Sequence, residues 1–474
     1  MQSRRDQVQA YFFVVGRLVA GLVQGKPDVL EHPNKRFNGG TVLGVLLAGL
    51  LMAIFGIYGL FVPGGNNSWR VDGTIVLDEG SGARYVYVGG QLRPVLNMAS
   101  ALLAVGQNSK LASVSQSSLT GVPVGTPIGI PGAPDGMPSA GKLNAGNWTV
   151  CARPADGLTV SSAATVTLRL DQPGGVAIPA EQGLVVSTPD GAAYLVWRGN
   201  RHRIADMVTQ EALGYDTGRA VRVSPAWLNV IPAGADLKPP SIPGIGGVGP
   251  AVGGQPGRVG QVYEVRNPAI TSDQFYVLTG SGLLPISHTV GAMLLAAPST
   301  RDAYPGDQVR PILVGPGALA GVAMVGGEAH ATDLPPTPPA IADLGVGMEP
   351  CMSFDLQADG GHVGTLVALA RASENQAVAP AGKQVAGATA DQIVVPAGGG
   401  ALVSSWPVPG AAPGTEYLVT DLGVKYPLAD DSVAASLGYG SVSGKRISPV
   451  LLNLLPTGPA LDPAAALTSR LVGS

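Results

Sequence analysis

Residues 41–62 read TVLGVLLAGLLMAIFGIYGLFV, an apolar run without a charged residue. As a helix rising about 1.5 Å per residue, its 22 residues reach about 33 Å, more than the roughly 30 Å hydrocarbon core of a bilayer. A buried core helix is the alternative, but such helices rarely run this long without a polar face. The stretch therefore predicts one transmembrane helix.

Charges on either side of this run orient the predicted helix. The 40 residues before it hold six basic residues against three acidic ones, and the first charge after it is Arg70. Because cytoplasmic flanks of membrane helices are rich in Lys and Arg, the sequence predicts a single-pass protein of the inner (plasma) membrane, with residues 1–40 cytoplasmic and the region after residue 63 outside. A cleaved signal peptide fits less well, since the preceding flank is long and no small-x-small cleavage site lies near Val62.

The cytoplasmic segment contains an amphipathic helical pattern. Arg4, Arg5, Gln9 and Arg17 lie away from an apolar stripe, and 40 residues are too few to bury that stripe internally. The pattern predicts a helix that lies on the inner membrane surface or docks on a partner. The stripe consists of Val8, Tyr11, Phe12, Val15, Leu18, Val19 and Leu22.

The composition of the whole chain indicates short strands joined by many turns. Of 474 residues, 68 are Gly and 41 are Pro, and aromatic residues make up only 5%. Hydrophobic residues still reach 45%, which is too many for a disordered chain. The net charge of −3 supplies no basic field, so nucleic acid is not an expected partner.

The chain has two cysteines, Cys151 and Cys351, and both follow the predicted membrane helix. In an oxidising compartment such a pair is expected to be bonded, and no CxxC metal or redox motif is present. The bond would close a loop of about 200 residues and contribute roughly 5 kcal/mol on the chain-entropy model. The sequence therefore predicts one disulfide, Cys151–Cys351.

Internal repeats organise the outer region. Residues 194–234 and 417–458 align with a single one-residue gap, a third copy begins at Tyr85, and a shorter copy occupies 274–296. Each copy predicts a short β-hairpin and then a short helix. In the two longest copies an Asp caps this helix, a Gly ends it and Ser-Pro opens a further helical turn, whereas the copy at 274–296 lacks the Ser-Pro end. The two longest copies share Tyr194/Tyr417, Leu213/Leu437, Gly214/Gly438, Tyr215/Tyr439, Ser224/Ser448, Pro225/Pro449, Leu228/Leu452 and Asn229/Asn453.

These features predict an α+β fold: a cytoplasmic helix, one transmembrane helix, and an elongated extracytoplasmic domain of four hairpin/helix repeats around a β-rich central core. The expected regions are the cytoplasmic segment 1–40, the membrane helix 41–62, repeat 1 at 71–125, a first core segment at 141–190, repeat 2 at 192–236, repeat 3 at 260–297, a second core segment at 300–415, repeat 4 at 416–460 and a tail at 461–474. Core strands are expected at Asn147–Ala152, Ala164–Leu170, Gln308–Val314, Gly364–Leu369 and Gln392–Val395, and surface loops at 121–138, 239–258 and 333–340.

Two partial nucleotide-binding motifs occur in the chain. Residues 136–143 fit G-x4-GK but end in Leu143, which lacks the hydroxyl that holds Mg²⁺. Residues 244–249 fit G-x-G-x-x-G between two prolines, with no predicted strand before or helix after. We expect both to be loops, and Asp430-Asp431 to cap a helix rather than catalyse. The histidines (His32, His202, His288, His330 and His362) lack metal-ligand spacing, so we expect no catalytic, cofactor-binding or metal-binding residues; for His202 and His288, in the repeat hairpins, we expect a surface position.

The N-terminal block RRDQVQAY at 4–11 is followed by Arg17-Leu18, Pro27-Asp28 and Pro33. With the membrane helix, the WRVD at 69–72, the Tyr-Val/Leu-Val repeats, the two cysteines and Ile447-Ser448-Pro449, this order resembles EccB. EccB is the membrane component of actinobacterial type VII (ESX) secretion systems. The resemblance covers essentially the whole chain and is weakest in the Pro/Gly-rich loops.

The resemblance implies a structural subunit that braces a secretion complex on the periplasmic side of the inner membrane. It implies EccC-, EccD- and EccE-like subunits as partners, self-association through the periplasmic domain, and a mycosin protease nearby. Two other functions stay open. Family members have been described as ATPases, although we see no nucleotide site in the sequence, and the repeats are likened to phage cell-wall-binding modules, which suggests a peptidoglycan contact.

Overall fold

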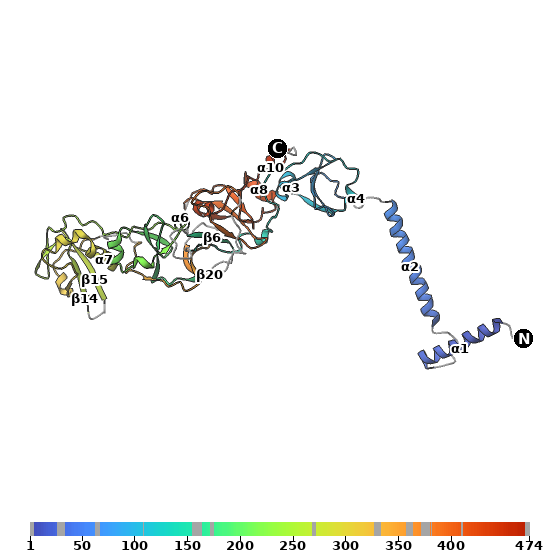
Figure 1. Ribbon diagram of the computed structural model, residues 1–474, viewed down its shortest axis with the longest axis horizontal. Helices are drawn as coiled ribbons and strands as arrows, with labels where there is room; N and C mark the ends of the chain where they lie inside the picture. The colour runs from blue at the N-terminus through green and yellow to red at the C-terminus, as the bar shows by residue number, and fades with distance from the viewer. Residues whose placement is uncertain are drawn as a thin grey trace. The chain divides into compact units, whose positions relative to one another are not determined.

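Figure 1 shows the protein as a computed structural model. It describes residues 4–25, 34–61, 67–107, 109–153, 164–170, 175–267, 272–326, 333–356, 364–370, 380, 382–408 and 411–469. Residues 1–71, 76–83 and 112–123 form one unit, and residues 72–75, 84–111 and 124–474 form the other. The first unit holds the long helices and the second holds most of the strands.

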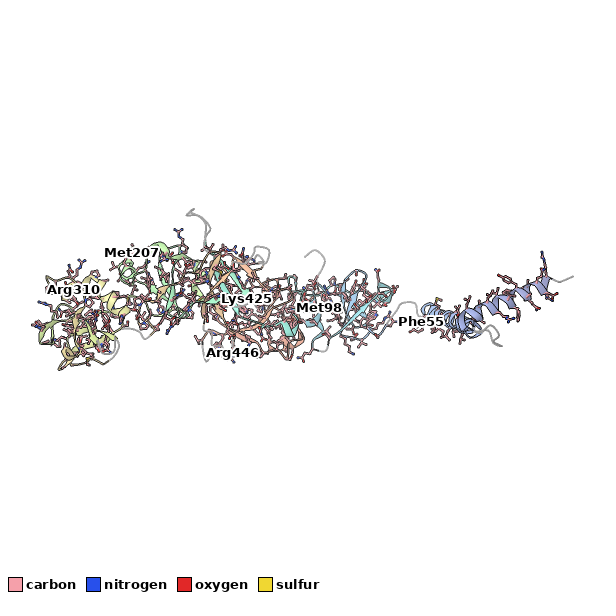
Figure 2. All side chains as sticks on the ribbon, turned by 90° about the horizontal axis from the view of Figure 1, so that it is seen from below. Phe55, Met98, Met207, Arg310, Lys425 and Arg446 are labelled. Atoms are coloured by element: carbon pink, nitrogen blue, oxygen red, sulfur yellow. A yellow bond between two sulfur atoms is a disulfide. The ribbon has the colours of Figure 1, made fainter. Side chains whose placement is uncertain are left out.

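Two long helices make up most of the first unit. α1 (Arg4–Gln24) carries the apolar stripe, and α2 (Asn34–Phe61) carries the run that the sequence places in a membrane. Among the described residues, Gly39–Tyr58 within α2 is the stretch long and apolar enough to cross a bilayer. Its side chains are exposed, for example Phe55 at 72% (Figure 2). Such a helix needs an apolar surrounding rather than water.

The second unit contains three sheets built on four strands of one topology, and one of these sheets has a fifth strand. In each sheet three consecutive strands form an antiparallel meander, and a fourth strand pairs in parallel with the first of the three. The sheets are numbered along the chain, and the first of them contains residues of both units. The second sheet comprises β8 (Gln182–Ser187), β9 (Ala193–Trp197), β10 (Asn200–Ile204) and β11 (Val221–Arg222). The third comprises β14 (Val262–Asn267), β15 (Ser272–Thr279), β16 (Gly282–Ile286) and β17 (Ile312–Val314). The fourth comprises β22 (Ala401–Ser405), β23 (Glu416–Val419), β24 (Lys425–Pro427) and β25 (Lys445–Ile447).

A similar hairpin lies near the start of the second unit. β2 (Arg84–Val88) pairs antiparallel with β3 (Gln91–Pro94), and α3 (Met98–Val105) follows. β1 (Thr74–Asp78) and β4 (Lys110–Val114) each contain residues of both units, and α4 (Gln116–Leu119) belongs to the first. Val86 and Ala101 are buried between this hairpin and α3.

The helix after each hairpin begins with the same kind of cap. The side chains of Asn97, Asp206, Ser287 and Asp430 accept hydrogen bonds from backbone N–H groups of the first helical turn. These N–H groups have no partner within a helix, so a capping oxygen stabilises the start. The helices are α3, α5 (Met207–Ala212), α7 (His288–Ala296) and α8 (Asp431–Ser436). The cap of α8 is thus Asp430, and Asp431 is its first residue.

Segments after three of these helices return to their hairpins at constant spacing. Parallel bridges join Leu92 to Val124, Arg201 to Ala233 and Lys425 to Thr457, with equal separations in sequence. A second set, whose separations in sequence are also equal to one another, joins Val95 to Ile128, Ile204 to Leu237 and Leu428 to Leu461. In two of the returning segments a Ser-Pro step starts a short helix, α6 (Pro225–Asn229) or α9 (Pro449–Asn453). Proline suits this first-turn position because its missing N–H would be unpaired there anyway.

A six-stranded sheet forms the centre of the largest hydrophobic core, in the order β21-β6-β5-β19-β20-β7. Its strands are β5 (Trp148–Arg153), β6 (Thr165–Leu170), β7 (Val176–Ala177), β19 (Met348–Phe354), β20 (Gly364–Ala370) and β21 (Gln392–Val394). Trp148, Trp227 and Phe354 are buried in this core. Trp227, on α6, also donates its indole N–H to Val150 O at 2.9 Å, which fixes α6 against the sheet.

The second unit is built from two similar halves. In one half, the segment after the first hairpin joins the fourth sheet, because Leu143 forms a parallel bridge to Gly400 beside β22. In the other half, the segment after the third sheet joins the second sheet, because β18 (Ala340–Ile341) pairs in parallel with β8. The helices pair accordingly, because α3 contacts α8 and α5 contacts α7. Figure 1 shows α3 beside α8 and α10 (Pro463–Ala466). The next strands of the two halves, β5 and β19, pair antiparallel with Cys151 opposite Cys351. An approximate twofold relation therefore centres on the cysteines.

Several sequence expectations differ from this fold. The expected core strand at 308–314 is β17, which pairs with β14 in the third sheet instead. The expected loop at 239–258 ends in a hairpin of β12 (Val248–Val252) and β13 (Gln255–Arg258), where two glycines leave room for Leu278. The expected loop at 333–340 contains the buried Leu334. In each repeat two further strands, one from before the hairpin in sequence and one from after it, extend the sheet beyond the first strand of the hairpin, where backbone groups would otherwise be unpaired.

Candidate functional site

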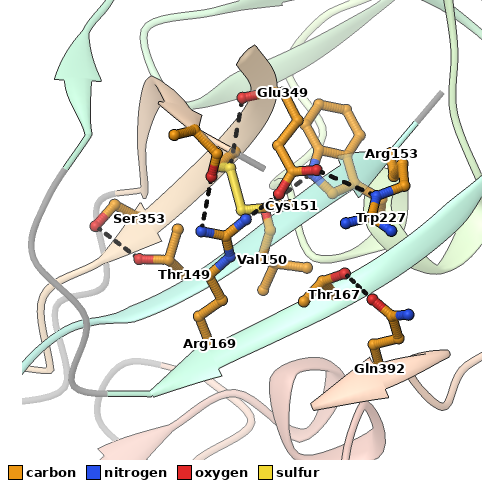
Figure 3. Close-up of a disulfide and its surroundings, with 12 residues drawn as sticks. Thr149, Val150, Cys151, Arg153, Thr167, Arg169, Trp227, Glu349, Ser353 and Gln392 are labelled. Atoms are coloured by element: carbon orange, nitrogen blue, oxygen red, sulfur yellow. Dashed lines mark hydrogen bonds and ion pairs between the residues drawn. A yellow bond between two sulfur atoms is a disulfide. The ribbon is translucent and has the colours of Figure 1, made fainter. Parts of the chain in front are cut away.

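The two cysteines lie at the centre of the six-stranded sheet, as Figure 3 shows. Cys151 on β5 and Cys351 on β19 are directly opposite each other, fully buried and joined by a disulfide. The bond links strands 200 residues apart in sequence. It therefore ties the two halves of the unit together at their approximate twofold axis.

Three charged side chains gather beside the disulfide. Glu349 on β19 is fully buried and accepts a hydrogen bond from the Arg169 guanidinium on β6, while Arg153 Nε on β5 lies 3.8 Å from its other oxygen. Arg169 also donates to Ala370 O on β20 at 3.0 Å, so its side chain reaches across the sheet (Figure 3). Burial lowers the pKa of Arg169, and the Glu349 charge opposes that shift. These contacts connect the four strands β6, β5, β19 and β20.

The chemistry available at this cluster is structural. A carboxylate oxygen of Glu349 and the two sulfurs lie within 4.8 Å of one another, which is the spacing of a possible metal site. The sulfurs are bonded to each other, however, and the Glu349 charge already faces two guanidinium groups. A thiolate is the form of cysteine that ligates metals, so this group of residues suits a covalent and ionic clamp better than a metal.

A second feature recurs in the second and fourth sheets. Lys425 (Figure 2) is buried, and its ammonium donates to Leu452 O and to Leu455 O, the latter at 2.9 Å. At the equivalent position of the second sheet, Arg201 donates to Leu228 O at 2.9 Å. Each cation thereby caps the last turn of a short helix, α9 or α6, where carbonyl groups lack helical partners. Burial lowers the pKa of Lys425 to about 8.

A hollow adjoins β24, the strand that carries Lys425. Its volume is about 780 Å³, and Val424, Tyr426, Pro459 and Gly132 contribute to its lining. Lys383 is the one charged residue among the described lining residues. This lining contains no acid–base pair, so the hollow does not suggest a reaction.

The two motifs that the sequence analysis discounted occupy different places. Lys142 ends a single 3₁₀ turn (Ala140–Lys142) and strand β5 follows it, whereas a phosphate-binding loop leads from a strand into a helix. Residues 244–247 form a turn, and Gly249 already belongs to β12.

The described histidines, His202 and His288, lie in different elements, His202 on β10 and His288 on α7. His202 is fully buried, and its Nδ1 is 2.9 Å from Ala235 O, so the expectation of a surface position was wrong for this residue. His288 is the first residue of α7 and is exposed, as expected, with its ring against Phe275. His32, His330 and His362 lie outside the described residues.

Sequence reasoning missed Arg169, Glu349 and the burial of Lys425. A signal for the first two was present, since each is a charge inside an otherwise apolar strand run, TVTLRL at 165–170 and MEPCMSF at 348–354. Their pairing was not visible, because the two strands are far apart in sequence and only the order β6-β5-β19 brings them together.

Comparisons with known proteins agree with this architecture. The family described as "Type VII secretion system ESX-1, transport TM domain B" matches residues 1–472. A relative named ESX-3 secretion system ATPase EccB3, from Mycolicibacterium smegmatis, is 29% identical and aligns over 98% of this chain and 90% of its own length. The solved EccB3 dimer from the ESX-3 core complex is similar with a TM-score of 0.67 at 26% identity, covering 83% of this chain and 100% of that chain.

A chain of an intact ESX-5 inner membrane complex is similar over 100% of this chain and 97% of its own length, with a TM-score of 0.69 at 24% identity. That likeness concerns the fold, which has one apolar helix near the N-terminus followed by a β-rich region. The family match extends over nearly the whole sequence and includes α2, the central sheet and the hairpins β2–β3, β9–β10, β15–β16 and β23–β24. The chain belongs to the EccB family of type VII (ESX) secretion proteins.

Proposed function

We propose that this protein is a structural subunit of a type VII secretion complex in the inner membrane, and that its β-rich unit braces the complex on the periplasmic side. The observation that carries the proposal is the full-length match to the family together with the likeness to EccB3 as a dimer. An assembly role suits the described residues, since their buried charges hold strands and helices together rather than facing a substrate.

The proposed topology places residues 1–40 in the cytoplasm and the second unit in the periplasm. The excess of basic residues before the apolar run of α2 supports this orientation, because such residues stay on the cytoplasmic side. The buried disulfide gives independent support, since disulfides persist in oxidising compartments.

The proposed organisation of the periplasmic region is four copies of one hairpin/helix unit around the central sheet. The shared capping residues and the regular bridge separations support this organisation. We propose the regions predicted from sequence, with β8 and β22 added to the second and fourth copies and β17 added to the third. Self-association of this region is proposed by analogy with the EccB3 dimer.

The partners that we propose are EccC-, EccD- and EccE-like subunits of the same membrane complex, with a mycosin protease and peptidoglycan as further contacts. Nucleotide hydrolysis is left out of the proposal even though the relative's name contains the word ATPase. Lys142 lies on a turn that leads into a strand, so its surroundings do not supply the helix N-terminus that usually holds a phosphate.

The native membrane complex tests this proposal. The full-length protein, tagged at its C-terminus and solubilised in a gentle detergent, should migrate as a large assembly that contains the three other subunits in fixed ratios. Untagged membranes carried through the same purification are the control for adventitious proteins. Recovery of this chain as a lone monomer, with the other subunits found together elsewhere, would refute the assembly role.

A separate assay tests nucleotide hydrolysis. Purified protein and its Lys142→Ala variant should release the same trace of phosphate from ATP, as expected for a contaminant. Turnover that the substitution abolishes would overturn the exclusion of this activity. Pull-down of the full-length protein with purified peptidoglycan examines the cell-wall contact, and the absence of any retention would remove it.

A further inference from the structure

α1 exposes an unusual amount of apolar surface for a helix outside a membrane. Leu22 is 85% exposed, Phe12 67%, Tyr11 66% and Leu18 61%. All four belong to the stripe that runs along one side of the helix. An exposed apolar stripe of this size marks a contact with another apolar phase, because water-exposed patches are normally small.

The remainder of α1 excludes a second membrane crossing. Arg17 lies in the second half of the helix, with its guanidinium 5.8 Å from the centre of the Phe13 ring. The Arg17 guanidinium thus packs on Phe13, the aromatic residue of α1 that lies off the stripe. A helix with an apolar face, charged residues elsewhere and modest overall hydrophobicity lies in the plane of a membrane surface rather than across it.

The position of α1 in the chain brings it close to a bilayer. Residues 25–33 separate α1 from α2, and nine residues span at most about 30 Å even when fully extended. If Gly39–Tyr58 spans the bilayer, α1 remains within that distance of the surface where α2 begins. The membrane is then present at high effective concentration, because the tether makes the contact intramolecular.

Charge favours an anionic surface at the same place. The segment before Thr41 holds six basic residues and three acidic ones, and two of the basic residues, Arg4 and Arg5, start α1. Long arginine side chains extend from a buried apolar face to phosphate groups at the surface. Basic residues near a membrane are attracted to anionic lipids within about a Debye length.

We propose that α1 lies on the bilayer surface at the end where α2 begins, with its apolar stripe among the acyl chains and Arg4 and Arg5 against anionic headgroups. This inference rests on the proposed membrane span of α2 and adds a lipid contact to the assembly role. The contact of α1 with the bilayer thereby restrains the end of α2 that follows it in the chain, which limits the depth and the tilt of the membrane helix.

The test uses the full-length protein reconstituted into vesicles of neutral lipid alone or with about one third anionic lipid. Because the two native cysteines are bonded to each other, a single introduced cysteine can be labelled with an environment-sensitive fluorophore. Val15→Cys places the label at the middle of the stripe. Ala10→Cys is the matched control, since five residues turn it about 140° away around the helix. Phe55→Cys reports on α2 independently.

The label at Val15 should be quenched by brominated lipids and protected from aqueous iodide, with an iodide quenching constant at least about three-fold below that at Ala10. Adding Arg4→Glu and Arg5→Glu should reduce this protection in anionic vesicles, while neutral vesicles should show less protection from the start. Equal iodide access at Val15 and Ala10 would overturn the proposal. Protection from iodide without lipid quenching would also overturn it, because the stripe would then be covered by protein.

The label at Phe55 separates this inference from the proposal on which it rests. If brominated lipids quench Phe55 and leave Val15 unquenched, the lipid contact of α1 is wrong and the membrane span stands. If neither label is quenched, the span itself fails.

Discussion

Replacing Glu349 by Gln removes one negative charge from the central sheet and keeps the shape of the side chain. In the native protein this fully buried carboxylate lies between Arg169 and Arg153. The side chains of the two arginines are only 8% and 18% exposed. The variant therefore leaves two guanidinium groups close together, and the carboxylate that both of them face is gone.

The expected loss in the free energy of unfolding is about 3–5 kcal/mol, the usual effect of removing one partner from a buried ion pair. The Gln amide oxygen can still accept a hydrogen bond from Arg169, so the effect comes mainly from the missing charge. Most single domains are stable by only about 5–15 kcal/mol, so this change is a large fraction of the total. The loss of stability should appear first in β5, β6 and β19, which carry the three charged side chains.

Hydrogen exchange followed by mass spectrometry on the full-length protein in detergent measures this loss strand by strand. The matched control is Glu416→Gln on β23, where burial and the nearby charge of Asp431 already raise the pKa of the carboxyl. A neutral amide is tolerated at such a position, with an expected change within about 0.5 kcal/mol. A change below about 1 kcal/mol in Glu349→Gln, or equal changes in the two variants, would refute the view that this ion cluster stabilises the central sheet.

Three further predictions concern the same unit. Cys151→Ala with Cys351→Ala should lower the free energy of unfolding by up to about 5 kcal/mol, since the bond closes a loop of 200 residues; urea unfolding that matches the native protein would contradict it. Burial lowers the pKa of Lys425 to about 8 in the folded state, against about 10.5 in the unfolded state. The contribution of this residue to the free energy of unfolding is therefore fully present above about pH 10.5 and is lost as the pH falls through 8. The native protein should therefore gain up to about 3 kcal/mol relative to Lys425→Met as the pH rises over this window, and parallel pH profiles of the two urea midpoints would exclude it. Trp227→Ala should lower stability by about 3–5 kcal/mol and loosen α6, measured as faster amide exchange at Pro225–Asn229, whereas unchanged exchange there would show that α6 is held elsewhere.

The chain's family and its long apolar helix are strong signals in the sequence. A charge-free run of 22 residues has few interpretations, since helix length and bilayer thickness are fixed by geometry. The hairpins and helices of the repeats were also predictable, because turns and caps depend on nearby residues. The Asp before each of α5 and α8 and the Gly after each of them are examples.

The grouping of strands into sheets was harder to predict from the sequence. The strand at Ile312–Val314 was expected in the core, yet its parallel partner β14 lies in the third sheet. A three-residue strand contains too little pattern to specify its neighbour, and a long connection separates it from β16. The expected loop at 239–258 was misjudged for a related reason, because Gly249 and Gly257 indicate close packing on Leu278 as well as turns.

By itself the sequence determined the long apolar helix, the hairpins, the capped helices and the expectation of a Cys151–Cys351 bond, all of which follow from local spacing or from the number of cysteines. Only the tertiary structure decided that β5 and β19 are neighbours, that Glu349 lies between two arginines, and that Lys425 closes a helix end. The physical reason is range. Caps, turns and helix length are set by residues within a few positions of one another, whereas the partner of a buried charge is set by strand order, which depends on the packing of the whole unit.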